Sequence, residues 1–174
     1  MGSCLSTYSL KGIPFDCASN LAGINVVYLG YKDDFSVTPS EDGHSCTITG
    51  GSGAKLYSYS FAKQTGSLTS TLTKDEANGT RFYTNTLALS FNKMEGAKHI
   101  EIEAMAAEAL IGIAGDNNGK FWVIGSDSYL SANSATAGSG TSYSDKNGYD
   151  IELSAMSAHL PYEITKANFE SYIA

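Results

Sequence analysis

Two glycine-rich segments of the 174-residue chain come near to known catalytic or phosphate-binding patterns. A nucleophile elbow needs Gly-x-Ser-x-Gly, but residues 50–54 read Gly-Gly-Ser-Gly-Ala. A phosphate loop needs four residues between its glycines and Ser or Thr after its lysine. Residues 115–121 have only three residues between the two glycines, and the lysine is followed by Phe121, so they do not match this pattern. We therefore expect no enzyme activity, no catalytic residue and no cofactor site.

Residues that could bind a metal are few and far apart. Cys4, Cys17 and Cys46 make no Cys-x-x-Cys pair, and the three histidines lie far from one another, which argues against zinc. Free thiols in a reducing compartment are the expected state. Residues 145–150 supply some oxygen ligands of a calcium loop but lack the terminal Glu of an EF-hand, so a turn is expected there. We expect no metal site.

Asn-Gly pairs are the most prominent structural signal. They occur at Asn78-Gly79, Asn118-Gly119 and Asn147-Gly148. Both residues tolerate the positive φ that a type I′ turn requires, so each pair predicts a hairpin turn between antiparallel strands.

The hairpin around Asn78-Gly79 is predicted to be long. Residues 55–63, 67–73 and 82–91 alternate between apolar and polar side chains, which indicates a sheet with one apolar face and one hydroxyl-rich face. Each arm would run for about a dozen residues, or about 40 Å, against a mean strand of about five or six. A hairpin of this length overhangs its own domain and should contact something outside it. The alternative is a plain solvated face, although such a face usually carries more Lys and Glu.

The remaining patterns predict further strands and one helix. We expect a strand that ends near Ile102, then a helix to about Leu110, and a strand pair at 111–114 and 120–124 buried on both faces, with Trp122 in the core. Other predicted elements are strands at 24–29, 149–155 and 160–164, a polar loop at 31–45, a loop or weak strand pair at 126–144, and a short helix at 167–174. The predicted fold is mainly β: an antiparallel β-sandwich or partial barrel with one flanking α-helix and a long β-hairpin. No repeat or linker divides the chain, so we expect a single domain over residues 1–174.

The charge content is low and its balance is acidic. Charged residues make up 17% of the chain and the net charge is −7, which disfavours a protein that grips phosphates. A surface so poor in charge suggests that neighbouring subunits cover part of it. No signal peptide is evident, and the longest apolar segment, 104–115, contains Glu108 and is too short to cross a bilayer, so we expect no membrane partner.

Three parts of the chain carry a family resemblance. They are residues 12–17 with 22–28, residues 65–79 with 87–91, and residues 116–122 with Gly125 and 145–153. In these segments the chain resembles the tail tube (major tail) proteins of long-tailed bacteriophages that infect Bacteroidetes-type gut bacteria. Together the segments span nearly the whole sequence.

The resemblance implies a fold and a role. Tail-tube-like subunits form hexameric rings that stack into a tube, and their long hairpins join into one inner barrel. It implies a structural virion protein of the tail, assembled in the bacterial host cytoplasm, with itself, the tape-measure protein and other tail proteins as partners. DNA would pass through the lumen during ejection without specific binding. The resemblance makes five hairpin residues candidates for the lumen wall: Thr69, Thr71, Thr73, Thr84 and Thr86. It makes the N-terminal segment and residues 31–45 candidates for ring-to-ring contacts.

Two other functions remain open at the level of the sequence. A phage neck or tail-terminator protein would form one ring rather than a stack. A non-viral β-sandwich binding or adhesion module would need an exposed platform of Trp and Tyr, whereas Trp122 is expected to be buried.

Overall fold

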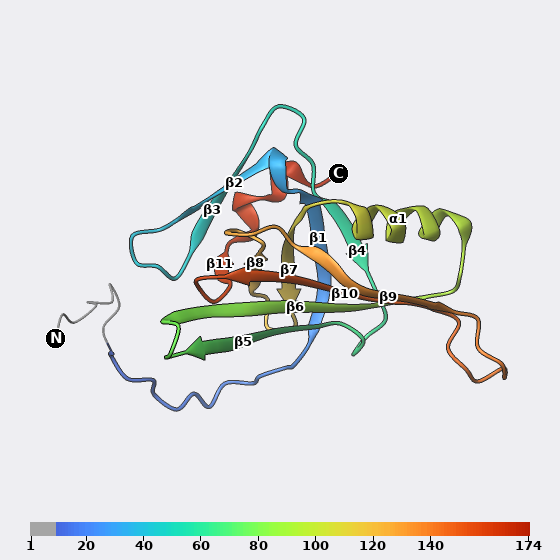
Figure 1. The fold of residues 1–174 in the computed structure, drawn as a ribbon, viewed down its shortest axis with the longest axis horizontal. Coiled ribbons are helices and arrows are strands. Elements are labelled where there is room, and N and C mark those ends of the chain that lie inside the picture. Colours follow the sequence, from blue (N-terminus) through green and yellow to red (C-terminus); the bar gives the residue numbers. More distant parts are fainter. Residues whose placement is uncertain (1–9) are drawn as a thin grey trace.

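The computed structural model describes residues 10–174 and is a sandwich of two antiparallel sheets with one flanking helix (Figure 1). Cys4 lies outside the described residues. The five-stranded sheet has, in spatial order, β11 (Tyr162–Ile164), β8 (Phe121–Ile124), β7 (Leu110–Asp116), β1 (Ile24–Tyr31) and β4 (Tyr57–Ser60). The four-stranded sheet has β5 (Ser67–Asp75), β6 (Thr80–Asn92), β10 (Gly148–Ser157) and β9 (Ser131–Gly138). A separate ribbon pairs β2 (Phe35–Pro39) with β3 (Cys46–Gly50), and the helix is α1 (Gly96–Ala107). The predicted mainly β sandwich with one flanking helix is confirmed.

The main core lies between the two sheets. The inner face of the four-stranded sheet contributes Leu87, Leu89, Ile151 and Leu153, each at most 2% exposed. These residues alternate along β6 and β10, so the period-two pattern of the sequence directly places them on one face. Helix α1 closes one side of this core with Met105.

A second core covers the other face of the five-stranded sheet. Ile111 and Ile113 of β7 pack there with Leu56 and Phe169, all fully buried. The β2–β3 ribbon and the C-terminal 3₁₀ turns η2 (Lys166–Asn168) and η3 (Glu170–Tyr172) form the outer layer. Strand β7 is therefore buried on both faces, as its continuous apolar run predicts.

The helix begins earlier than the sequence predicts. The expected strand ending near Ile102 is wrong, because α1 already starts at Gly96, and Leu110 is the first residue of β7 rather than the end of the helix. Ile100 and Ile102 alternate like strand residues, but on a helix they point to different sides. Ile102 packs on the main core while Ile100 is 69% exposed. The helix formers around them outweigh two β-branched residues.

The predicted polar loop at 31–45 is also wrong. It contains a 3₁₀ turn, η1 (Lys32–Asp34), and strand β2, in which Phe35 is buried and Val37 pairs with Ile48. The predicted C-terminal helix is likewise two 3₁₀ turns. Of the run 55–63, only β4 is a strand, and it pairs with β1 in the five-stranded sheet rather than extending the hairpin. Residues 126–144 are predicted to be a loop or a weak strand pair, and they contain one strand, β9, whose partner is β10 outside that range.

Two of the three Asn-Gly pairs close hairpins where predicted. Asn78-Gly79 lies in the turn from β5 to β6, and Asn118-Gly119 lies in the turn from β7 to β8. Only the glycines have positive φ, +67° and +80°, so neither turn is the type I′ that the pairs suggested.

The third pair, Asn147-Gly148, is not a hairpin turn. Gly148 is the first residue of β10, and residues 139–147 form the loop from β9. A Cβ on Gly148 would lie 2.1 Å from the carbonyl oxygen of Phe91, so glycine is needed for the close approach of β10 to β6. The carbonyl oxygen of Asn147 accepts a hydrogen bond from the backbone N–H of Lys93 (2.6 Å), which holds the end of β6 in place.

Candidate functional site

The five threonines singled out in the sequence lie on one face of the β5–β6 hairpin. Thr69 is paired with Thr86 and Thr71 with Thr84, and directly paired residues of antiparallel strands share a face. Thr73 follows on the same face, opposite Phe82. This is the outer face, because the alternate residues Leu68 and Leu87 point into the main core. The sequence pattern therefore assigned these threonines to the correct face.

The same outer face continues over β10 and β9. Thr84 is paired with Met156 and Thr86 with Ser154, and Glu152 is in turn paired with Ser134 of β9. Sequence reasoning missed this extension, although the alternation in 149–155 was seen, because nothing in the sequence pairs β6 with β10. We call this surface the hydroxyl face. Its strand residues include Ser67, Thr69, Thr71, Thr73, Asp75, Thr80, Phe82, Thr84, Thr86, Ala88, Ser90, Asn92, Ser131, Ser134, Thr136, Asp150, Glu152, Ser154 and Met156.

The charges on the hydroxyl face are carboxylates. Asp75, Asp150 and Glu152 lie on it, whereas Lys74 and Arg81, the two basic residues within the four strands, alternate onto the opposite face. The hydrogen bond from Lys146, in the β9–β10 loop, lowers the pKa of Asp150.

Further hydrogen bonds hold the other two carboxylates, Asp75 and Glu152, in place. Asp75 accepts hydrogen bonds from the side-chain and backbone N–H groups of Asn78, which lower its pKa. Glu152 accepts a hydrogen bond from the side chain of Asn133 (2.6 Å). The face is therefore acidic, rich in hydroxyl groups and free of lysine and arginine within its strands.

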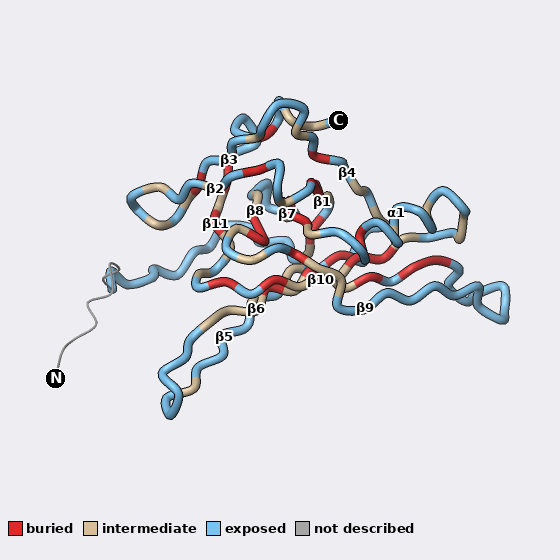
Figure 2. The backbone as a smooth tube through the Cα atoms, turned by 45° about the horizontal axis from the view of Figure 1, so that its top comes forward, coloured by how far each residue is buried: buried red, intermediate tan, exposed pale blue. Residues whose placement is uncertain are grey.

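The outer half of the hairpin projects beyond the body of the sandwich (Figure 2). Leu72 lies on the inner, core-facing side of β5 but is 49% exposed, because no strand of the other sheet covers it. Its partner Tyr83 is half-buried. At the base of the projection, Ser70 donates a hydrogen bond to the buried side chain of Asn85 (2.6 Å). The observed strands have 9 and 13 residues, and the expected overhang is present. Both strands form its tip, because the additional residues of β6 lie at the end away from the turn and pair with β10.

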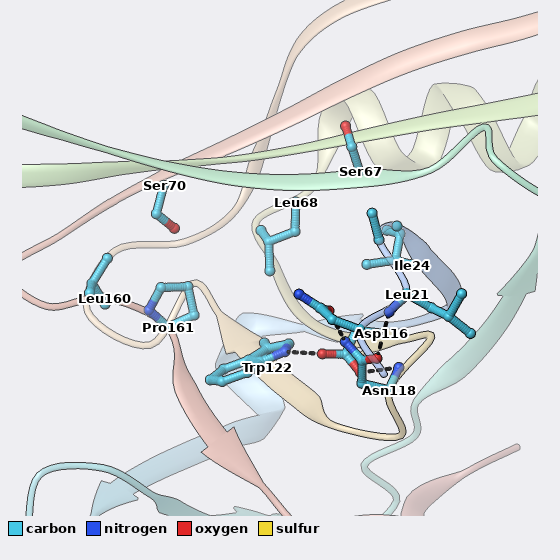
Figure 3. A pocket seen from close by; sticks show the side chains of 13 residues that line it. Leu21, Ile24, Ser67, Leu68, Ser70, Asp116, Asn118, Trp122, Leu160 and Pro161 are labelled. Carbon is cyan, nitrogen blue, oxygen red and sulfur yellow. Dashed lines mark hydrogen bonds between the residues drawn. The ribbon is translucent and has the colours of Figure 1, made fainter. Parts of the chain in front are cut away.

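A cavity of about 450 Å³ lies between the inner side of β5 and the β7–β8 turn (Figure 3). Its wall includes Leu68, Leu160 and Trp122, and the indole N–H of Trp122 donates to Asp116 (3.1 Å). Trp122 is thus half-buried at a cavity wall rather than in the core as predicted. The other oxygen of Asp116 accepts from the backbone N–H groups of Asn118 and Lys120, so this carboxylate serves the turn.

The described residues provide little for metal or thiol chemistry. Among residues 10–174, no three His, Cys, Asp or Glu side chains come together as metal ligands. Cys17 is exposed, whereas Cys46, the first residue of β3, is buried in the second core, and this burial raises the pKa of its thiol to about 11.

No helix within the described part of the chain is long and apolar enough to span a membrane.

Comparison of the chain with protein-family models, with curated proteins and with solved structures found no match in any of the three.

Proposed function

We propose that this protein is the subunit of a bacteriophage tail tube, a structural virion protein that conducts DNA during ejection. The observation that carries the proposal is the hydroxyl face: a wide, acidic sheet surface without lysine or arginine in its strands, on a sheet that overhangs its own body. A plain solvated face would carry mixed charges, including lysine, along its strands.

The edges of the four-stranded sheet support ring assembly. Strands β5 and β9 lie at its two ends, and among the described strands neither has a second partner. Open edges favour pairing with another chain, and closing a sheet into a barrel removes them. Six such sheets, joined edge to edge with strands about 4.8 Å apart and tilted by about 40°, would enclose a barrel roughly 48 Å across. A barrel of that width admits a DNA duplex.

The chemistry of the hydroxyl face suits a wall along which DNA moves without being held. Affinity for the phosphate backbone comes from lysine and arginine, whose contacts release counterions. The hydroxyl face instead presents threonine and serine with Asp75, Asp150 and Glu152, and the nearby ammonium of Lys146 is bound to Asp150 and Ser90. Weak repulsion of phosphate and an absence of basic contacts would allow rapid passage.

In this proposal the partners are other copies of the chain, the tape-measure protein and further tail proteins, and the location is the virion tail. A neck or tail-terminator ring would use the same lateral contacts but would not stack. Electron microscopy of the purified protein in negative stain distinguishes these cases. We expect rings and stacked tubes with six-fold class averages; isolated single rings would favour the terminator, and monomers at high concentration would contradict both.

The lumen assignment has its own test, the substitution Thr71→Lys. Because Thr71 is exposed, a lysine there should permit folding and assembly while adding a ring of cations that retards DNA. We expect a loss of infectivity in virions built with this variant. The control is Thr71→Gln, because a glutamine side chain is nearly as long as that of lysine but carries no charge. Equal phage titres for the two variants would contradict the assignment of Thr71 to the lumen wall.

One observation favours a second candidate, a carbohydrate-binding or adhesion module. Trp122 forms part of an open cavity next to the carboxylate of Asp116, and sugar sites often combine an aromatic ring with a carboxylate. Screening of the purified protein against a glycan array tests this candidate. Binding that is lost in Trp122→Ala would favour the module over the tube.

A further inference from the structure

The N-terminal segment leaves the sandwich as an extended arm, which we define as residues 10–19. Its large apolar side chains lie almost wholly in solvent: Leu10 is 104% exposed, Ile13 98% and Phe15 90%. In the described part of the chain no strand or helix packs against them. Three large apolar side chains in water are costly, at about 1.5–3 kcal/mol each relative to burial. Such an arm requires a surface that will cover it.

The base of the arm is firmly held. The side chain of Asn118 accepts a hydrogen bond from the backbone N–H of Leu21 (2.9 Å) and donates one to the side chain of Asn20 (2.9 Å). Asn117 donates to the carbonyl oxygen of Ala22 (2.7 Å). The β7–β8 turn therefore fixes where the arm starts. From there the arm runs toward the end of the molecule that holds the β5–β6 turn, and α1 lies at the opposite end in both views (Figures 1 and 2).

An apolar groove that could cover the side chains of the arm lies beside α1. This cavity of about 310 Å³ is bounded by the ends of β1 and β4, by the start of β7 and by α1. Its rim is apolar and open to solvent: Tyr31 and Tyr57 are each 44% exposed and Ile100 is 69% exposed. Exposed aromatic and aliphatic side chains gathered in this way are typical of a contact surface.

The surroundings of the groove favour an extended, basic occupant. Strand β4 is the last strand of its sheet, so its outer edge can accept an extended segment through main-chain hydrogen bonds. Glu101 lines the groove and Glu108 follows α1, and both are exposed. The part of the arm with the exposed apolar side chains, residues 10–15, carries Lys11 as its one charged side chain, and Asp16 follows it. The charge of residues 10–15 therefore complements that of Glu101 in the groove.

We propose that residues 10–15 of one copy dock into the groove between α1 and β4 of the next copy. Because the arm and the groove lie toward opposite ends of the molecule, the contact is head-to-tail, so it links each copy to the next instead of pairing two copies with each other. It repeats from copy to copy and so joins successive layers of subunits. This inference extends the proposed function. It rests on the tube proposal only in taking the linked layers to be stacked rings. Its partner is a second copy of this chain.

A peptide of residues 10–19 tests the docking directly. The peptide carries a fluorophore and is titrated with the full-length variant Ile13→Asp/Phe15→Asp, whose own arm can no longer compete. We expect saturable binding by fluorescence anisotropy and at least a tenfold loss of affinity when Ile100→Asp is added. Tyr129→Ser, which removes a comparably exposed aromatic side chain (54%) outside the groove, should leave the affinity unchanged. No binding, or equal binding to all three proteins, overturns the docking.

Microscopy then separates the docking from the tube proposal. In the double arm variant and in Ile100→Asp, we expect single rings where the wild-type chain forms stacks. Since Ile100 and the arm residues are exposed, both variants should unfold at the wild-type denaturant concentration. Stacks that persist in both variants overturn the docking and leave the tube standing. Failure of the wild-type chain to form rings, combined with saturable peptide binding, overturns the tube and leaves the docking standing.

Discussion

The five-stranded sheet is covered on both faces, whereas the four-stranded sheet is covered on one. Strand β7, in the first sheet, has six of its seven residues buried, and its side chains enter both cores. Strands β6 and β10, in the second, alternate between core residues and the hydroxyl face. The first sheet stabilises the subunit. The second holds half of the main core and still leaves a broad surface and two edges for other molecules.

This difference explains how a chain with few charges can expose a wide sheet. Buried strands need no polar residues beyond their paired backbone, so β7 is almost entirely apolar. The hydroxyl face is exposed to solvent but carries mainly threonine and serine, with three carboxylates and with no lysine or arginine in its strands. We interpret this as the composition of a surface that meets other molecules without binding them tightly. The following substitutions test how far the two sheets differ.

The largest effect is expected inside the doubly covered sheet. Ile113→Ala removes a fully buried side chain from β7 and should lower the free energy of unfolding by about 2–5 kcal/mol. The matched change in the other sheet, Thr71→Ala, should alter it by less than about 0.5 kcal/mol, because Thr71 is exposed. Urea denaturation followed by tryptophan fluorescence measures both. Similar losses in the two variants would contradict the assigned difference between the sheets.

A smaller loss is expected where two strands of the four-stranded sheet approach closely. Gly148→Ala would place a Cβ 2.1 Å from the carbonyl oxygen of Phe91, which should separate β10 from β6 and destabilise by about 1–3 kcal/mol. Gly138 is paired with Gly148, but nothing lies within 4 Å of a Cβ placed there. Gly138→Ala is therefore the control and should be close to neutral. Equal thermal midpoints for the two variants would refute the close-approach explanation.

The base of the overhanging hairpin depends on one buried polar pair. Ser70→Ala leaves the side-chain oxygen of Asn85, which is 2% exposed, without the hydroxyl that donates to it. The expected loss is about 1–3 kcal/mol, at the low end if water can enter beside the projecting tip. A double-mutant cycle with Asn85→Ala isolates the coupling between the two side chains. A coupling energy near zero would show that the hydrogen bond does not stabilise the hairpin.

The smallest effect concerns the long loop on the four-stranded sheet. Asp145 accepts hydrogen bonds from the backbone N–H groups of Ser142 (2.8 Å) and Thr141 (2.9 Å), which lower its pKa to about 2. A lowered pKa means that the stabilisation is present above the unfolded value, near 4, and is lost as the pH falls toward 2. The stability difference between wild type and Asp145→Asn should therefore shrink over that range, and an NMR titration should place the pKa of Asp145 well below the ordinary aspartate value of about 4. A constant difference would contradict this assignment.

Local patterns predicted the elements whose residues interact with near neighbours. The alternation in 67–73 and 82–91 placed Thr69 and Thr86 on one face, and the Asn-Gly pairs at 78 and 118 marked true turns. Several of the predictions that were wrong depended on distant partners. Phe35 is in a strand because β3 pairs with β2, and Gly148 opens a strand because the end of β6 lies against it. Trp122 is only half-buried because a cavity adjoins it, which no local pattern reveals.

The sequence by itself determined the class of the fold, the face on which the residues of β5 and β6 lie, and the absence of lysine and arginine from residues 67–73 and 82–90. These properties follow from a period of two residues and from residue type, which are local. Only the tertiary structure decided that β6 pairs with β10, so that the hydroxyl face spans four strands, and that the arm leaves from one end while the groove opens toward the other. The physical reason is that pairing between distant strands is selected by the summed burial of the whole core, to which each segment contributes only a part.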